Sequence, residues 1–266
     1  MKIGKVIQPS SAICISNEET IIVRGSDLCN DIIGKMSFTE YFYFLLTGEK
    51  PNQATLKVVN ATLISIAEHG FVPSVQAARM TFAASPEALQ GAVAAGLLGC
   101  GSVILGASAN AGEFFTDIRN LMLKGHSAEQ AATEIIKQYR IEMKAIPGYG
   151  HPLHKERDPR VTALFKVAED AGSNLEFIAI ADAVERVIPE IVGKQLKLNV
   201  SAAIPAVLLG AGFPLKALRG IPILARCAGL IAHLYEEQEQ PVGFALSYQA
   251  TREYQYTGTV PENFKS

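Results

Sequence analysis

The segment IPGYGHPLHKERDPR, residues 146–160, decides how this sequence is interpreted. It places Gly148 and Gly150 on either side of a tyrosine, follows them with two histidines, and ends in Asp-Pro-Arg. A plain connection between helices needs only one or two turn residues. Glycine adopts positive φ readily and lets a ligand approach the backbone. The segment therefore predicts a flexible loop with chemistry attached to it.

The end of the segment predicts a helix start, with Asp158 as the N-cap and Pro159 at the first helical position. Arg160 then falls in the first turn, where the helix dipole disfavours a cation. It either pairs with Asp158 or Glu156, or binds an anionic ligand at the helix N-terminus. Two roles are likewise open for His151: a core histidine with its hydrogen bonds satisfied, or a group that moves a proton.

Helical periodicity covers almost all of the remaining chain. Helix-start signals stand at Ser37, Ser85, Ser127 and Asp158. Gly48 and Gly172 mark helix ends, and Pro189 is expected to kink or end its helix. Only residues 12–25 have the pattern of short strands, with a turn near Asn17. The fold class is therefore mainly α with a short N-terminal β segment.

Composition excludes several classes of function. The chain has 266 residues, 48% of them hydrophobic, and a formal net charge of −2. It contains no basic run, so we expect neither nucleic acid nor a membrane surface as a partner. The cysteines lie far apart and form no CxxC pair, which disfavours a structural zinc site; they are Cys14, Cys29, Cys100 and Cys227. The first residues lack an apolar run typical of a signal peptide, so free thiols in the cytoplasm are expected.

Residues 89–112 contain no charged side chain and are long enough to cross a bilayer. The segment is rich in glycine, however, and contains polar side chains such as Gln90 and Asn110. Small residues let other backbones approach closely. We therefore expect a tightly packed helix or helix pair of a soluble protein.

The loop sequence PGYGHPLHKERDPR resembles the signature of the citrate synthase family, and further segments match the family in the same order. They are RGSDLCNDIIGKMSFTEYFYFLLTGEKP (24–51), AEHGFVPSVQAAR (67–79), LKLNVSAAIPAVLLGAGFP (196–214), ILARCAGLIAHLYEE (223–237) and YQYTG (254–258). The similarity is greatest to the short citryl-CoA lyases of the family. It covers essentially the whole chain.

The resemblance implies a role for each matching position. His151 would contact the carbonyl or hydroxyl of the substrate and act as its acid or base. His69, Arg160 and Arg226 would hold substrate carboxylates. The CoA thioester would lie against Pro147, Gly148, Tyr149 and Gly150. The implied reaction makes or breaks the carbon–carbon bond between an acyl-CoA, such as acetyl-CoA, and a 2-oxo acid, such as oxaloacetate, without a permanent cofactor or metal.

Three positions depart from the family pattern. Ile104 or Leu105 stands where citrate synthases have a histidine, a substitution that the citryl-CoA lyases share. Ser201 stands where both classes have an aspartate that serves as a base, and a serine hydroxyl has little basicity near neutral pH. Arg252 is displaced by one position from an arginine that the family supplies to the partner subunit.

These departures leave two interpretations. The chain is either an enzyme of the kind just described, with Ser201 in its catalytic centre, or a homologue that binds CoA esters and dicarboxylates without turnover. Asp182 and Glu185 are expected to face solvent or to pair with Arg186, and His154 is expected to be a solvated loop histidine.

The family fold implies a large domain, 1–106 with 211–266, and a small domain, 107–210. It also implies a homodimer or a larger homo-oligomer, with the uncharged segment 89–112 at the subunit contact. The small molecules expected as partners are an acyl-CoA and a di- or tricarboxylate.

Overall fold

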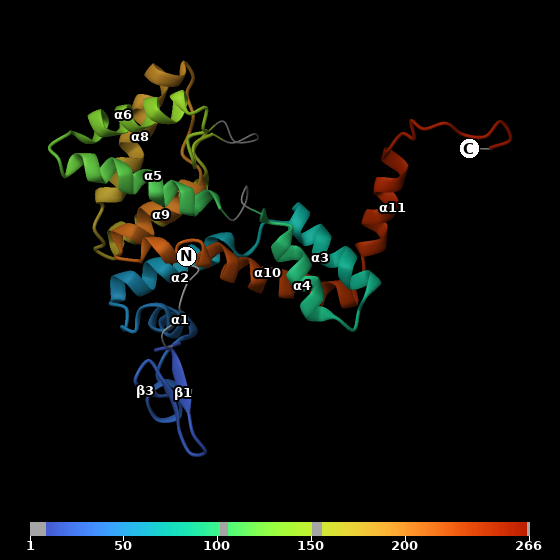
Figure 1. Cartoon of the computed structure of the whole chain (residues 1–266), viewed down its shortest axis with the longest axis horizontal. Helices are drawn as coiled ribbons and strands as arrows, with labels where there is room; N and C mark the ends of the chain where they lie inside the picture. Colours follow the sequence, from blue (N-terminus) through green and yellow to red (C-terminus); the bar gives the residue numbers. More distant parts are fainter. Residues whose placement is uncertain (1–8, 102–105, 151–155, 265–266) are drawn as a thin grey trace. The chain divides into compact units, whose positions relative to one another are not determined.

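The computed structural model describes residues 9–101, 106–150 and 156–264 (Figure 1). Helices dominate it, and the only sheet in these ranges is small and N-terminal, so the predicted mainly α class is confirmed. The chain forms two compact units. The first unit runs to Ser65 and resumes at Ala107–Ile221, and the second unit consists of Ile66–Gly106 and the residues from Pro222 on.

The first unit begins with an antiparallel sheet in the order β1 (Cys14–Ser16), β2 (Ile21–Val23) and β3 (Ser26–Asp27). The side chain of Asn17 accepts hydrogen bonds from the backbone N–H groups of Glu19 and Thr20, which confirms the predicted turn. A short π-helix, η1 (Leu28–Ile32), follows. Val23, Ile32 and Phe44 form a small apolar core that joins the sheet to the next helix.

Helices α1 (Phe38–Thr47) and α2 (Gln53–Ala67) follow the sheet. The predicted capping box of α1 is present, because Ser37 and Glu40 exchange side chain–backbone hydrogen bonds. Gly48 ends the helix with φ +79°, a conformation that glycine adopts without strain. The sequence signals at both ends of α1 are thus confirmed.

The helical body of the first unit consists of α5 (Ala107–Met122), α6 (Ala128–Ile141), α7 (Pro159–Asp170), α8 (Glu176–Val192), α9 (Val200–Gly210) and the 3₁₀ turn η3 (Leu215–Ala217). Helix α9 packs against α5, α7 and α8, and α6 packs against α8. Phe114, Ile136, Ile180 and Leu208 are fully buried between them. The predicted caps Ser127 and Asp158 start α6 and α7.

Pro189 does not end its helix, so that part of the prediction is wrong. Helix α8 continues past it to Val192, and Gly193 then ends the helix with φ +75°. Ile188, directly before the proline, is fully buried. Apolar packing of one whole helix face outweighs the hydrogen bond that proline removes.

The second unit contains the end of α2, then α3 (Pro73–Ala84), α4 (Leu89–Leu98), α10 (Gly220–Glu239) from Pro222 on, and α11 (Gly243–Glu253). Its core consists of Val75, Ala78, Phe82, Ala92, Leu230 and Leu234. A Cβ added at Gly96 would lie 2.7 Å from Leu230. The absence of a side chain there lets α4 pack closely against α10.

Ser85 does not cap a helix start, which corrects a second prediction. It is the C-cap residue of α3, and its hydroxyl donates to Glu87. Helix α4 begins only at Leu89, after Ala88, which makes no side-chain cap bond. The Ser-Pro-Glu pattern resembles a helix start, but the chain uses it for the turn between two packed helices.

The described residues of the uncharged segment 89–112 form α4 and the first part of α5, which belong to different units. The expectation of a tightly packed helix pair therefore stays a prediction. Among the described residues, one helical stretch, Leu215–Glu239, is long and apolar enough to cross a membrane. A buried core helix of a soluble protein meets the same criteria.

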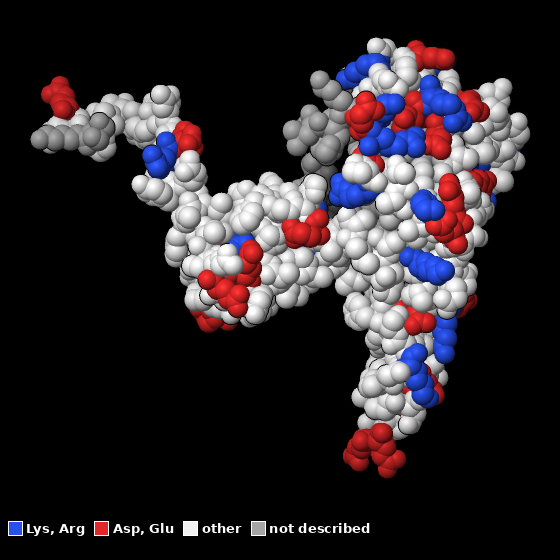
Figure 2. Space-filling model, turned by 180° about the vertical axis from the view of Figure 1, so that it is seen from behind, with Lys and Arg blue, Asp and Glu red and all other residues white. Residues whose placement is uncertain are grey.

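The predicted small domain, 107–210, lies entirely within the first unit, whereas the predicted large domain contributes residues to both units. The division into a large and a small domain therefore stays a prediction. On the face seen in Figure 2, basic and acidic side chains are interspersed over the helical body of the first unit.

Candidate active site

The loop before His151 is held by its own chain. Gly148 and Gly150 have φ +82° and +86°. A Cβ at Gly148 would overlap Ala202 at the start of α9, whereas the nearest atom of the described residues to a Cβ at Gly150 is 3.4 Å away on Leu196. Gly148 is therefore required by internal packing as well as by backbone conformation.

Tyr149 anchors the same loop from inside. It is 7% exposed, and its hydroxyl donates to the carbonyl of Ala181 at 2.8 Å. Burial raises the pKa of Tyr149 well above its usual range, so the hydroxyl stays protonated and keeps donating. The ring also packs edge-on against Phe115. Its side chain thus fixes the loop position from within the first unit.

Backbone and amide hydrogen bonds join the loop to the start of α9. The Gly150 N–H donates to the Lys197 carbonyl at 2.8 Å, and the Asn199 N–H donates to the Gly148 carbonyl at 3.0 Å. The Asn199 amide also donates to the Gly150 carbonyl and accepts from the backbone N–H of Ser201, each at 2.9 Å. The structure thus brings Gly150, the residue before His151, together with the helix end that carries Ser201. His151, His154 and positions 104 and 105 lie outside the described residues.

Arg160 pairs with the cap of its own helix, the first of the two alternatives. Its backbone N–H donates to Asp158 Oδ1 at 2.9 Å, and its guanidinium donates to both carboxylate oxygens at 3.1 and 2.7 Å. The Asp158 side chain is 3% exposed, against 26% for Arg160. The carboxylate compensates the cation at the helix N-terminus and points its guanidinium in a fixed direction.

The prediction for Asp182 and Glu185 is wrong. Both pair with Arg157, at 2.8 and 3.1 Å, whereas Arg186 pairs with Glu129 at 2.6 Å. They line one wall of a cavity of about 330 Å³. Their i, i+3 spacing on one helix could have indicated a common partner, but nothing in the sequence indicated that Arg157 would be that partner.

Glu185 also holds the segment that pairs with the loop. It accepts from the backbone N–H of Leu198 at 2.9 Å, and Lys197 Nζ lies 3.5 Å from its carboxylate. Its side chain is only 12% exposed. Helix α8 therefore supports both sides of the site: the loop through Tyr149, and the 197–199 segment through Glu185.

The second unit carries the other two predicted carboxylate-binding residues. His69 is exposed and follows the end of α2, and Arg226 is buried at 8% exposure on α10. A Cβ at Gly229, one turn beyond Arg226, would overlap the Ala67 carbonyl. Glycine at position 229 thus allows α10 to pack directly against Ala67, at the end of α2. The helix that carries Arg226 therefore also supports the turn that contains His69.

Arg252 lies in the last turn of α11, with its guanidinium carbon 5.9 Å from the ring centre of Tyr248. Within residues 9–101, 106–150 and 156–264, no three His, Cys, Asp or Glu side chains come together as a metal site would need.

These observations define a class of protein. It is a mainly helical protein in which a Gly-Tyr-Gly loop is fastened to the Asn-capped start of a helix, with Arg160 on the first unit and His69 and Arg226 on the second. The profile of the family "Citrate synthase, C-terminal domain" matches residues 9–243. The chain therefore belongs to the citrate synthase family.

Individual relatives agree with this assignment. A citrate synthase of Haloferax volcanii is 25% identical over 201 residues, which cover 74% of this chain and 51% of the relative. The chain spans about half the length of the curated relatives that it matches.

Among solved structures, the citryl-CoA lyase from Hydrogenobacter thermophilus superposes with a TM-score of 0.82 at 33% identity, covering 96% of this chain and 97% of that one. The ATP citrate lyase from Methanothrix soehngenii, solved with citrate and coenzyme A, superposes with a TM-score of 0.76 at 21% identity. That match covers 99% of this chain and 44% of the lyase, and it shows the common fold.

Proposed function

We propose that this chain is a citryl-CoA lyase-like enzyme. It would cleave or form the carbon–carbon bond between an acyl-CoA, such as acetyl-CoA, and a 2-oxo acid, such as oxaloacetate. The observation that carries the proposal is the similarity to a citryl-CoA lyase over nearly the whole of both chains. The fastening of the Gly-Tyr-Gly loop to the start of α9 supports it, because this is where the resemblance puts the reacting groups.

In the cleavage direction, His151 would remove the proton from the tertiary hydroxyl of citryl-CoA. That oxygen becomes the carbonyl of oxaloacetate as the carbon–carbon bond breaks. The bonding electrons pass to the departing acetyl group, which leaves as the enolate of acetyl-CoA and is then protonated at carbon. Synthesis runs through the same steps in reverse. A histidine can take and return this proton near neutral pH.

The substrate carboxylates would be held by His69, Arg160 and Arg226. The Arg160 contacts with Asp158 use its Nε and Nη2 groups. A guanidinium has five N–H donors, so further N–H groups can meet a ligand carboxylate while Asp158 keeps the side chain oriented. The loop Pro147 to Gly150 would lie against the CoA thioester, which is a substrate and not a bound cofactor.

Ser201 favours a second candidate, a homologue that binds CoA esters and dicarboxylates without turnover. The serine lies in the first turn of α9, where its backbone N–H bonds to Asn199. Its hydroxyl is no useful base near pH 7. Loss of a general base lowers a rate by about 10²–10⁴-fold, so proton transfer to or from the acetyl carbon would need another group.

A titration and an assay separate the two candidates. Binding of CoA, acetyl-CoA and oxaloacetate is measured by calorimetry, and citryl-CoA cleavage is followed by the appearance of acetyl-CoA and oxaloacetate in the wild type and in Ser201→Asp. Turnover by the wild type supports the lyase. Binding without turnover, with activity only in Ser201→Asp, supports the binding protein. Absence of both binding and turnover with these compounds contradicts the proposed substrates.

We further infer a homodimer or larger homo-oligomer that acts in the cytoplasm, with no membrane or nucleic-acid partner. Two observations support this inference: proteins of the family form dimers, and the sequence contains no basic run. Sedimentation equilibrium and cell fractionation test these two inferences, and a monomer at micromolar concentration would contradict the first.

A further inference from the structure

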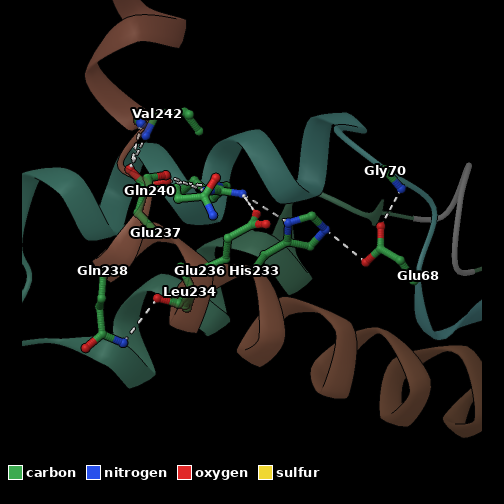
Figure 3. A network of polar contacts seen from close by, with 11 residues as sticks. Glu68, Gly70, His233, Leu234, Glu236, Glu237, Gln238, Gln240 and Val242 are labelled. Carbon is green, nitrogen blue, oxygen red and sulfur yellow. Dashed lines mark hydrogen bonds and ion pairs between the residues drawn. The ribbon is translucent and has the colours of Figure 1, made fainter.

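Arg79 of α3 is a buried cation surrounded by groups of α10 and the residue that follows it. Its side chain is 0% exposed. Nε lies 2.5 Å from Glu237, Nη1 lies 2.6 Å from Glu236, and Nη2 donates to the Gln240 carbonyl at 3.0 Å. Figure 3 shows the network around these groups. A charge this deeply buried is retained only where it is paired, so the arginine fixes α3 against the end of α10.

The same guanidinium determines which nitrogen of His233 carries a proton. Arg79 Nη1 lies 3.3 Å from His233 Nδ1. Arginine can only donate, so Nδ1 accepts and the proton of the neutral ring is on Nε2. Nε2 in turn lies 2.9 Å from the carboxylate of Glu68 (Figure 3). The His233 ring thus lies between Arg79 and Glu68 and contacts both, so the buried arginine helps to fix the place of the Glu68 carboxylate.

Glu68 then holds the turn that carries His69. Its other carboxylate oxygen accepts the backbone N–H of Gly70, so the carboxylate spans both sides of His69 (Figure 3). Partial burial acts to raise the pKa of Glu68, but the contacts with His233 and with the backbone N–H groups of Gly70 and His69 lower the pKa below its ordinary value. The carboxylate is therefore ionised at neutral pH and is a strong acceptor.

We propose that Arg79 and His233 are positioning residues that act through Glu68 on the turn 68–70 and so direct His69 toward its ligand. The inference deepens the proposed function and rests on it, because that function gives His69 the task of binding a substrate carboxylate. Helix α10 carries both His233 and Arg226. One helix thus sets the position of both carboxylate-binding residues of the second unit.

Two substitutions of one residue test the connection. In His233→Gln the side-chain amide nitrogen reaches the place of Nε2 and can keep the polar contact with Glu68. In His233→Asn the shorter side chain keeps a polar atom only near the place of Nδ1. We expect His233→Asn to raise KM for citryl-CoA, and Kd for oxaloacetate, by about tenfold, as for one lost polar contact with a carboxylate. The value of kcat should change little, and His233→Gln should stay within about threefold of the wild type.

Glu68→Gln is a second variant that does not depend on replacing a buried ring, because the Glu68 side chain is 53% exposed. It should raise KM as His233→Asn does. Glu87→Gln is the matched control, since Glu87 lies in the same unit and its carboxylate accepts from the hydroxyl of Ser85. The control should leave KM unchanged. Equal KM values in all four variants and the wild type would overturn the positioning role.

A measurement without ligand distinguishes this inference from the proposed function. The amide proton shift of Gly70, read by NMR, reports its hydrogen bond to Glu68. The bond should weaken in His233→Asn and Glu68→Gln and persist in His233→Gln. If the protein neither binds oxaloacetate nor cleaves citryl-CoA, the proposed function fails, and this shift alone decides the anchoring. An unchanged shift in His233→Asn and Glu68→Gln would overturn the anchoring even in an active enzyme.

Discussion

The loop 146–150 and the turn 68–70 both lead to a histidine of the proposed site, but they are fastened in different ways. The loop is held mainly by neutral groups: the Gly150 N–H on a carbonyl, the Asn199 amide, and the buried hydroxyl of Tyr149. The turn is held through the charged side chains of Glu68 and the fully buried Arg79, with the His233 ring between them. A neutral hydrogen bond contributes about 0.5–1.5 kcal/mol. In a buried charge network, removal of one partner leaves the other charges unpaired, so a single substitution lowers the stability by more than one hydrogen bond contributes.

The largest effect is expected for Arg79→Ala. Glu237, 3% exposed, would keep its charge without this partner, at a cost of about 3–5 kcal/mol in the free energy of unfolding. Arg79→Lys should cost less, since an ammonium keeps the charge but cannot reproduce the planar fork. Urea unfolding followed by circular dichroism measures both. A loss below about 1 kcal/mol in Arg79→Ala would show that the network is not a cooperative charge cluster.

Gly148→Ala tests the neutral fastening of the loop. The new methyl group would overlap Ala202 and sit on a backbone with φ +82°, which should cost at least about 1–3 kcal/mol. Gly150→Ala is the matched control, because it has φ +86° but its nearest neighbour is 3.4 Å away. It should cost only the backbone strain of an alanine at positive φ, about 1–2 kcal/mol. Equal losses in urea unfolding would mean that backbone conformation alone, and not the contact with α9, requires Gly148.

Glu185→Gln tests the ionic contribution on the loop side. The amide can still accept from Leu198 but loses the charge that faces Arg157 and Lys197, so we expect a loss of about 1–2 kcal/mol. Asp182→Asn should cost below about 1 kcal/mol, because Asp182 is 33% exposed and solvent screens its pair. If thermal unfolding shows the larger loss for Asp182→Asn, the assignment of Glu185 as the main support of segment 197–199 is contradicted.

The smallest effect is a pH dependence that should separate the two regions. The pKa of Glu68 is lowered in the folded chain, so its contribution to stability is present above the ordinary carboxyl pKa and is lost as pH falls through the lowered value. The Gly70 amide proton should therefore shift as pH is lowered from 7 to about 3.5. The Gly150 amide donates to a carbonyl and should shift less. Equal shifts at Gly70 and Gly150 would contradict the ionic anchoring of the turn.

Much of the fold could be predicted, because its signals are local. The Ser37–Glu40 and Ser127–Gln130 capping boxes, the Asp158 cap and the glycine after α1 each act within one helical turn. The Ser85 and Pro189 predictions failed for the same reason. Each prediction used only neighbouring residues, whereas contacts between helices decided where the helix began or continued.

The site could be predicted in part. The resemblance gave the positions of the loop, Ser201, Arg160, His69 and Arg226, and the pairing of Arg160 with Asp158 follows from two residues in one turn. The supports of the site did not follow from the sequence. Glu185 was expected to face solvent or to pair with Arg186, but it holds the Leu198 N–H. Gly148 was interpreted as leaving room for CoA, although Ala202 fills the space beside it.

By itself the sequence determined the helical class, the family and the identity of the groups available for chemistry, because caps, periodicity and motif spacing act over short stretches of chain. Only the tertiary structure decided which of those groups support one another. Arg79 and Glu237 are 158 positions apart, and Tyr149 reaches Ala181 across 32. The reason is physical: a buried charge or a side-chain-free glycine gains its role from what packs against it, and that neighbour is set by the whole fold.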